Sequence, residues 1–143
     1  MITTLETAVR KLRAGGRRIT TQRRAVVNAL AAMGCARSAE EVHVRARRHH
    51  RGLGLVTVYR TLDALVEEGV AQSMHLGDGR TRYELTETGH HHHLVCLSCG
   101  MVERLDGCLL RRGSRVGVGR HFTVIGHRLE LFGYCAACSG SAQ

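Results

Sequence analysis

Two Cys-x-x-Cys pairs, Cys96 with Cys99 and Cys135 with Cys138, are the residues of this chain with the clearest chemical potential. Four thiolates at this spacing are typical of a closed tetrahedral zinc site. Residues 100–134 separate the pairs, so a shared metal would hold together the two ends of a small unit. Such a unit buries little apolar surface, and a structural zinc can supply about 10 kcal/mol of folding free energy. The spacing therefore predicts a structural Zn(II) bound by these four cysteines.

Four consecutive histidines, His90–His93, precede the first cysteine pair. The run leads into an apolar segment typical of a strand, and successive side chains of a strand point to opposite faces. Alternate histidines would therefore share a face, and the run could supply two metal sites, with Glu84 and His127 as candidate partners. Imidazole and carboxylate ligands suit zinc, iron, manganese and nickel, so ligand type alone does not select a metal. A solvated polar strand is the alternative interpretation.

The chain of 143 residues carries a net charge of +9, and every basic residue except Lys11 is arginine. A surplus of this size favours a polyanionic partner. Two Phe, three Tyr and no Trp offer few rings for stacking on single-stranded bases, so double-stranded DNA is the expected partner. A basic protein without a nucleic-acid partner is the alternative that charge alone leaves open.

No apolar run approaches the length of a membrane span, and the first residues lack the apolar segment of a signal peptide. We therefore expect a cytoplasmic protein with no membrane partner. In a reducing compartment, closely spaced cysteines favour metal binding over disulfides. Cys35 and Cys108 have no partner in the sequence and are expected to be small buried residues.

The first half of the chain has the pattern of four helices followed by a β-hairpin. The first helix is expected around Leu5–Leu12, and the second is Gln22–Met33, capped by Thr20 or Thr21. The third begins at a Ser38/Glu41 capping box and reaches about Arg48. The fourth is Thr57–Glu68, capped by Thr57. The expected strands, Val70–Leu76 and Arg80–Leu85, flank a glycine-containing turn. This order is typical of a winged helix-turn-helix, in which the Thr57–Glu68 helix would enter the major groove and the hairpin would be the wing.

The exposed face of the Thr57–Glu68 helix offers Tyr59 and Arg60 to DNA. Arg60 would contact a guanine edge or a phosphate, and Tyr59 a thymine methyl or a phosphate. The alternative is that Tyr59 packs half-buried and that Arg60 is a solvated charge.

Beyond residue 93 the pattern changes to short apolar strands around the cysteine pairs. The expected strands are Leu94–Leu97, His121–Ile125 and Arg128–Tyr134, with a short helix suggested within Arg104–Arg120 by Leu105, Leu109 and Leu110. The change of pattern near Thr86 divides the chain into a winged-helix domain, residues 1–86, and a metal-binding domain, residues 87–143. The predicted fold class is α+β.

Taken together and in order, four segments of the chain resemble the ferric uptake regulator (Fur) family of bacterial metal-dependent repressors. They are Arg18–Arg23, Thr57–Leu62, His90–Cys99 and His127–Cys135, and the resemblance runs from about Gly15 to Cys138. It implies a winged-helix DNA-binding domain and a C-terminal dimerisation domain with a four-cysteine zinc. It also implies a regulatory metal near the domain junction that closes a homodimer onto a palindromic operator.

The resemblance further implies roles for individual residues. The four cysteines match the structural zinc site, three residues match the regulatory hinge site, three match an additional site in the dimerisation domain, and a further set of residues matches the DNA contacts. The expected assignments are regulatory ligands Glu84, His91 and His93; additional-site ligands His90, His92 and His127; and DNA contacts Arg18, Arg23, Thr57, Tyr59 and Arg60.

The hinge site departs from the family pattern. Its usual histidine, two residues before the serine of the third helix, is Ala36 here. Cys35 is adjacent and His43 lies further along the helix, and either is a candidate substitute.

The additional site also departs from the pattern. Its usual carboxylate falls at Leu110 or Arg111, and Glu103 is the nearest replacement. The identity of the sensed metal is therefore open, with zinc and iron ahead of manganese and nickel.

The expected function is a metal-responsive, sequence-specific DNA-binding repressor of metal-homeostasis genes, of the iron or zinc uptake type. A peroxide-sensing member of the same family and a constitutive winged-helix protein with a purely structural zinc are the alternatives. The sequence has no zinc-deaminase, His-Glu-x-x-His or Gly-x-Ser-x-Gly motif, so an enzyme acting on a small organic substrate is not expected.

Overall fold

The computed structural model describes residues 4–86, 89–108, 110 and 121–141. The chain divides into two compact units, Met1–Gly89 and His90–Gln143. The division follows Gly89, whereas the sequence pattern placed the domain boundary after Thr86. No helix among the described residues is long and apolar enough to cross a membrane.

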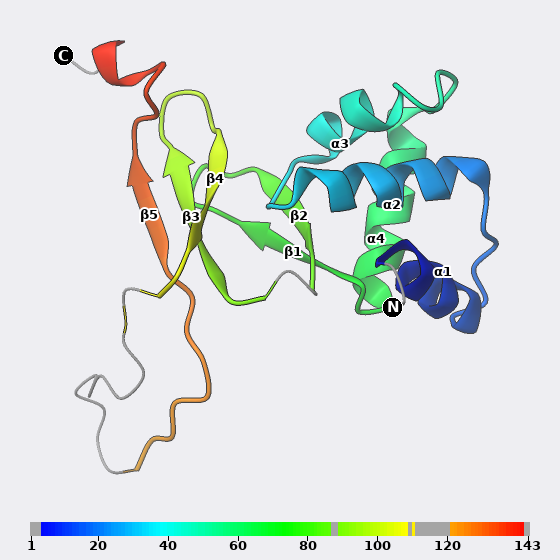
Figure 1. Cartoon of the computed structure of the whole chain (residues 1–143), viewed down its shortest axis with the longest axis horizontal. Coiled ribbons are helices and arrows are strands. Elements are labelled where there is room, and N and C mark those ends of the chain that lie inside the picture. Colours follow the sequence, from blue (N-terminus) through cyan, green and yellow to red (C-terminus); the bar gives the residue numbers. More distant parts are fainter. Residues whose placement is uncertain (1–3, 87–88, 109, 111–120, 142–143) are drawn as a thin grey trace. The chain divides into compact units, whose positions relative to one another are not determined.

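Four helices and a two-stranded antiparallel hairpin make up the first unit (Figure 1). The helices are α1 Thr4–Ala14, α2 Thr21–Met33, α3 Ala39–Ala46 and α4 Leu55–Glu67. Their inward faces share one hydrophobic core, to which α2 contributes Val26 and Leu30 and α4 contributes Leu62 and Leu65, each at most 2% exposed. Burial of one such side chain stabilises the fold by about 1.5–3 kcal/mol. The predicted succession of helices is confirmed.

Local capping explains where the middle helices begin. Thr20 caps α2, because its hydroxyl accepts a hydrogen bond from Arg23 N at 3.1 Å. Ser38 opens α3 with a complete capping box: Ser38 Oγ accepts from Glu41 N at 3.2 Å, and Glu41 accepts from Ser38 N at 2.8 Å. The helix ends at Ala46, before the predicted end near Arg48.

The start of α4 differs from the prediction. Gly54 stands at its N-cap, so Thr57 lies inside the first turn and does not cap the helix. The carbonyl of Thr57 accepts a hydrogen bond from Thr61 Oγ1 at 2.8 Å. The prediction was wrong because glycine can occupy the cap position without a side-chain hydrogen bond, so the helix begins before Thr57.

The hairpin consists of β1 Ala71–His75 and β2 Thr81–Leu85. Its connection uses Gly77 and Gly79, whose φ angles of +75° and +74° favour glycine. Across the turn, the Arg82 guanidinium donates to both carboxylate oxygens of Asp78, at 2.7 and 2.6 Å. Because Arg82 is 2% exposed, this pair holds a buried charge at the base of the turn.

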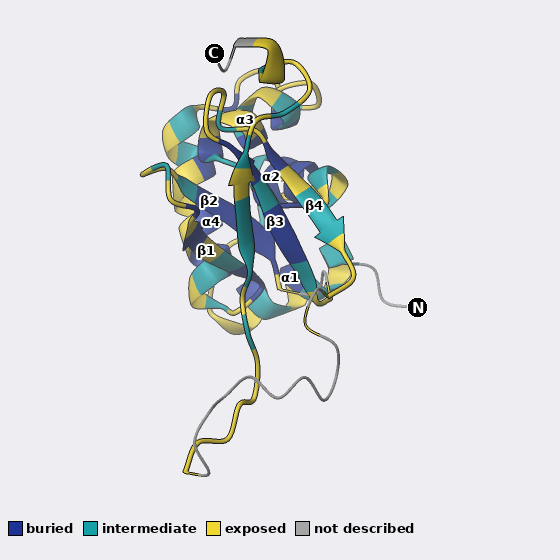
Figure 2. Ribbon diagram, turned by 90° about the vertical axis from the view of Figure 1, so that its left-hand side faces the viewer, coloured by how far each residue is buried: buried dark blue, intermediate teal, exposed yellow. Residues whose placement is uncertain are grey.

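The second unit is a three-stranded sheet of order β4-β3-β5, followed by a short 3-10 helix, Ser139–Ser141 (Figure 1). The strands are β3 His91–Cys96, β4 Val102–Asp106 and β5 Glu130–Gly133. β3 pairs antiparallel with β4 and parallel with β5. The central strand β3 is mostly buried, whereas the edge strand β5 is half-buried (Figure 2).

Two predictions for this unit were wrong. Leu105 lies in β4 rather than in a helix, because β4 extends the pairing of the sheet; Leu109 and residues 111–120 lie outside the described residues. Residues 121–125 form no strand, and each of them is exposed. Alternating apolar residues form a strand only where a neighbouring strand pairs with their backbone, and the structure records no such pairing for this segment.

Candidate metal centres

The four cysteines predicted to bind zinc lie together where β3 and β5 end. Their sulfur atoms all lie within 4.8 Å of one another, and Cys99 Sγ is 3.8 Å from Cys135 Sγ. Thiolates on a tetrahedral zinc, each about 2.3 Å from the metal, are roughly 3.8 Å apart. None of the six cysteines, all among the described residues, forms a disulfide. The donor set therefore fits a closed zinc site.

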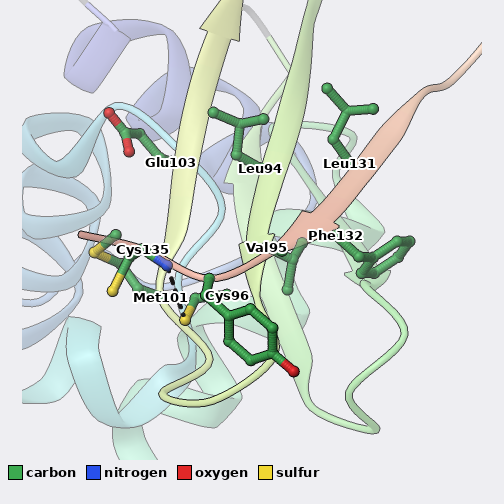
Figure 3. Close-up of a pocket in the computed structure, with 10 residues that line it drawn as sticks. Leu94, Val95, Cys96, Met101, Glu103, Leu131, Phe132 and Cys135 are labelled. Atoms are coloured by element: carbon green, nitrogen blue, oxygen red, sulfur yellow. Dashed lines mark hydrogen bonds between the residues drawn. The ribbon is translucent and has the colours of Figure 1, made fainter. Parts of the chain in front are cut away.

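Backbone pairing brings the two cysteine pairs together. β3 and β5 run parallel with Cys96 opposite Gly133, so Cys135 follows directly beyond the end of the sheet. Gly100 N donates to Cys96 O at 2.9 Å, and this tight turn keeps Cys99 beside Cys96. Figure 3 shows the link between the pairs, in which Cys135 N donates to Cys96 Sγ at 3.4 Å.

Hydrogen bonding gives the thiols of this group different pKa values. Backbone N–H groups of Cys99 and Cys135 donate to the sulfur of Cys96 and lower the pKa of its thiol to about 6. The Ser98 hydroxyl lowers the pKa of Cys138, but hydrogen bonds with the Cys135 and Cys99 thiols outweigh this effect and raise that pKa to about 11. A zinc ion would displace the shared protons, because zinc binds thiolates.

The histidine run divides between the two faces of β3. The ring centroids of His91 and His93 are 4.9 Å apart, and those of His90 and His92 are 4.8 Å apart. His127 joins the second pair, with its centroid 4.7 Å from that of His90 and 5.3 Å from that of His92. The structure thus brings together the three histidines predicted for the additional site.

A fourth donor, Cys108, lies in this group. Its sulfur is 3.1 Å from His127 Nε2, and one ligand atom from each of the four residues lies within 4.8 Å of the others. Cys108 is exposed, so the prediction of a buried residue was wrong. Its place in this group could not be predicted, because Cys108 lacks a Cys-x-x-Cys partner and its segment has the pattern of a weak helix rather than of a chain leaving β4.

His92 is buried without a hydrogen-bond partner. It is 1% exposed, and neither ring nitrogen has a partner among the described residues. Burial, followed by the neighbouring His90 and His127 rings, lowers the pKa of His92. Buried polar atoms are normally satisfied, and the neutral imidazole is the form that binds metals. The unsatisfied ring of His92 therefore fits a metal ligand.

Glu103, the predicted carboxylate replacement, does not join this group. The register of β3 with β4 places Leu105 opposite His92 and Glu103 opposite Leu94. Glu103 is therefore one side-chain pair further along the sheet, about 7 Å from the level of His92. Leu110 is an exposed apolar residue, and Arg111 lies outside the described residues.

The three residues predicted for the regulatory site come from both units. Glu84 lies in β2 of the first unit and is 1% exposed. His91 and His93 lie on one face of β3 in the second unit. Their joint binding of one metal stays a prediction.

The residues predicted to contact DNA all lie in the first unit. Arg18 and Arg60 are exposed, and Thr57 is half-buried in the first turn of α4. The Arg23 guanidinium donates to the carbonyl of Arg18. Tyr59 is 37% exposed, and its hydroxyl donates to Glu40 Oε1 at 2.6 Å. This hydrogen bond raises the pKa of Tyr59 and lowers the pKa of Glu40.

Comparison with known proteins identifies the family of the chain. Residues 14–132 match the sequence profile of the ferric uptake regulator family. The chain is similar to the ferric uptake regulation protein of Bacillus subtilis (strain 168), with 39% identity over 108 residues that cover 72% of each chain. It is 37% identical over 126 residues to the zinc uptake regulation protein of Mycobacterium tuberculosis (strain ATCC 25618 / H37Rv), covering 87% of this chain and 97% of that relative.

Solved structures give the same result. The Helicobacter pylori ferric uptake regulator, described as having three functional metal binding sites, matches with a TM-score of 0.79 and 26% identity over 99% of this chain and 98% of the other. A zinc-bound manganese uptake regulator matches with a TM-score of 0.75 and 31% identity over 93% and 99%. These matches confirm the predicted α+β fold. The chain belongs to the ferric uptake regulator family, whose members are metal-responsive transcriptional regulators rather than enzymes.

Proposed function

We propose that this chain is a homodimeric, DNA-binding repressor whose affinity for its operator is set by a divalent metal. The observation that carries the proposal is the separation of donors into a cysteine quartet and two histidine groups on opposite faces of β3. A closed four-thiolate site suits a permanent structural zinc, whereas imidazole-containing sites exchange metal more readily and suit a sensor. The genes controlled would be those of metal uptake.

The first unit supports DNA binding through its exposed basic residues. α4 presents Arg60 on its exposed face, and a surface hollow beside α3 is lined by Arg47, Arg48 and Arg51. Arginines so placed would bind phosphates of duplex DNA while α4 lies in the major groove. The hydroxyl of Tyr59 is already hydrogen-bonded to Glu40, so its ring is the part that we expect to contact a thymine methyl.

We propose that Glu84, His91 and His93 bind the regulatory metal and that Cys35 supplies the missing fourth ligand. Arg37 and Tyr83 form an antiparallel bridge, with backbone hydrogen bonds of 3.0 and 2.8 Å, which carries the segment containing Cys35 along the Glu84 end of β2. Cys35 is buried and its neighbour Ala36 offers no ligand. The other candidate is less suitable, because His43 Nε2 is already 2.7 Å from Leu53 O.

The second unit supports a homodimer. Its sheet has β5 at one edge, and the sheet and the following loop expose Phe132 and Tyr134 at 50% and 52%. Together with Leu94 and Leu131 these side chains line an apolar depression (Figure 3). A second copy of the chain would cover this surface, and a dimer would hold two α4 helices at a fixed separation that matches a palindromic operator.

Metal would act by selecting the DNA-binding conformation. A metal shared by ligands of the two units binds only when the units adopt one arrangement, so it raises the population of that arrangement. By linkage, operator DNA must tighten metal binding by the same factor. Zinc or iron is the proposed metal; the likeness to a zinc uptake regulation protein over most of both chains and the thiol of Cys35 favour zinc.

The test is an anaerobic titration of operator DNA binding against free iron, zinc, manganese and nickel, with protein that keeps one zinc in the cysteine quartet. The proposal predicts that one metal promotes DNA binding at far lower free concentration than the others. Replacement His93→Ala should abolish that response, whereas His75→Ala, an exposed histidine of the hairpin, should preserve it.

Metal-independent operator binding would instead support a constitutive DNA-binding protein, the second candidate. Ala36 favours that candidate, because it removes one expected ligand.

A further inference from the structure

The group formed by His90, His92, His127 and Cys108 has the composition of a complete tetrahedral metal site. Three imidazoles and one thiol each offer one atom within 4.8 Å of the others. Four donors held this closely, from three separate segments of the second unit, can surround one ion without a further ligand. In such a site, sulfur would stand in place of the carboxylate that the family pattern expects here.

The strand geometry explains why these four residues meet. His92 of β3 and His90, which directly precedes the strand, lie on the same side through the alternation of side chains, and their rings are in contact. The parallel register of β3 with β5 pairs Leu94 with Leu131, and His93 N donates to Leu129 O at 3.5 Å, so the chain before β5 carries His127 to the level of these histidines. Cys108 arrives from the other side, directly after β4, which ends at Asp106 opposite His91.

Two observations indicate that this group binds a ligand. His92 is 1% exposed, and neither of its ring nitrogens has a hydrogen-bond partner among the described residues. An unpaired buried polar group destabilises the fold unless a ligand satisfies it. The contact of 3.1 Å between Cys108 Sγ and His127 Nε2 places a sulfur donor against an imidazole, and the group contains no carboxylate from the described part of the chain. A cation would satisfy these donors together.

We propose that Cys108 is the fourth ligand of this site and that its thiolate makes the site selective for zinc over iron(II) and manganese(II). Tetrahedral coordination by nitrogen and sulfur suits zinc, whereas carboxylates favour the harder cations. The thiol releases its proton when the metal binds, and the Zn–S bond forms in its place. This inference rests on the metal-binding part of the proposed function and is independent of DNA binding.

The test uses the full chain with zinc kept in the cysteine quartet and with the replacements His93→Ala and Cys35→Ser, which remove a histidine and the thiol proposed for the regulatory site. Cobalt(II) titrated into this protein should give a sulfur-to-cobalt charge-transfer band and the intense visible spectrum of tetrahedral cobalt. Cys108→Ser should remove the charge-transfer band and weaken zinc binding, measured by competition with a chelator, by tenfold or more. His75→Ala, which replaces an exposed histidine of the hairpin, is the control and should leave both measurements unchanged.

A second variant tests selectivity directly. Cys108→Asp restores an oxygen donor, so it should still bind metal but should lose at least tenfold of the preference for zinc over manganese(II). The inference is overturned if the charge-transfer band persists in Cys108→Ser, or if Cys108→Asp keeps the same metal preference. These measurements are made without DNA. A negative result would therefore contradict the role of Cys108 but not metal control of DNA binding, which the operator titration tests. Cys108 is exposed, so neither replacement disturbs a packed core.

Discussion

Cys96 is both the last residue of β3 and a member of the cysteine quartet, so one side chain joins the sheet to the proposed zinc. Its sulfur accepts a backbone hydrogen bond across the quartet, and its thiol has a lowered pKa. Cys108 belongs to a different group and is exposed. These two cysteines therefore allow the structural and the exchangeable metal to be separated by single replacements.

We expect Cys96→Ser to abolish the structural zinc and to unfold or strongly destabilise the second unit. A structural zinc contributes on the order of 10 kcal/mol to a small domain, which exceeds the stability of a typical unit of this size. Zinc stoichiometry and thermal unfolding measure the effect. In protein that holds only the quartet zinc, Cys108→Ser is the control and should keep that zinc and the unfolding temperature. Equal stability of the two variants would contradict a structural role for the quartet.

Arg60 is the side chain of α4 for which we expect the largest effect on DNA binding. Arg60→Ala should weaken binding to the operator by about 1–3 kcal/mol and relax specificity at one base position if it contacts a guanine. Arg13→Ala removes an equally exposed arginine from the end of α1 and serves as the control. Affinities for operator and for unrelated DNA at one salt concentration provide the comparison. Equal losses in the two variants would identify Arg60 as a solvated charge.

At the scale of the elements, the hairpin depends on one buried ion pair. Asp78→Asn should destabilise the first unit by about 2 kcal/mol at neutral pH, because Arg82 keeps its buried charge but loses a carboxylate that accepts two of its hydrogen bonds. Arg80→Ala, an exposed residue of the same turn, is the control. Chemical denaturation of both variants gives the free energies of unfolding.

The same pair predicts a pH dependence. The hydrogen bond from Arg82 lowers the pKa of Asp78 from its usual 3.8 to about 2. A carboxyl whose pKa is lower in the folded chain stabilises the fold above the unfolded pKa, and that stability is lost as the pH falls from about 4 to about 2. The difference in stability between the parent chain and Asp78→Asn should therefore shrink over this range. A difference that stays constant down to pH 2 would exclude the pair as its cause.

Elements with local signals could be predicted from the sequence. Helix α3 carries its own start signal in the Ser38/Glu41 capping box, and the β1–β2 turn carries the glycines that its backbone requires. Alternation within a strand also predicted that the four histidines divide into two pairs. These features depend on residues within a few positions of one another, which is why the pattern was sufficient.

Some features that depend on distant pairing could not be predicted. The prediction of a strand at residues 121–125 was wrong because the local sequence does not indicate whether a partner strand is available. Cys108 meets the histidines only through the register of β3 with β4 and the path of the chain before β5. Glu103 was a reasonable candidate by position, and a shift of one cross-strand pair removes it from the group.

At the scale of the whole molecule, we expect dimerisation to depend on the sheet of the second unit. Phe132→Asp should weaken the dimer at least tenfold, because it places a charge within an apolar surface that the partner would cover. Val44→Asp alters an apolar residue of α3 that is 64% exposed, and it should leave association unchanged. Sedimentation over a range of protein concentrations measures both. A dimer unaffected by Phe132→Asp would place the interface on another surface.

The central claim is that metal bound outside the cysteine quartet controls the affinity for DNA. The most direct measurement is the operator dissociation constant of one preparation that holds only the quartet zinc, determined before and after a regulatory metal is added without oxygen. Our account predicts at least a tenfold tightening, equivalent to a coupling free energy of about 1.4 kcal/mol, and no tightening in the His93→Ala variant. The same dissociation constant with and without that metal would contradict metal control.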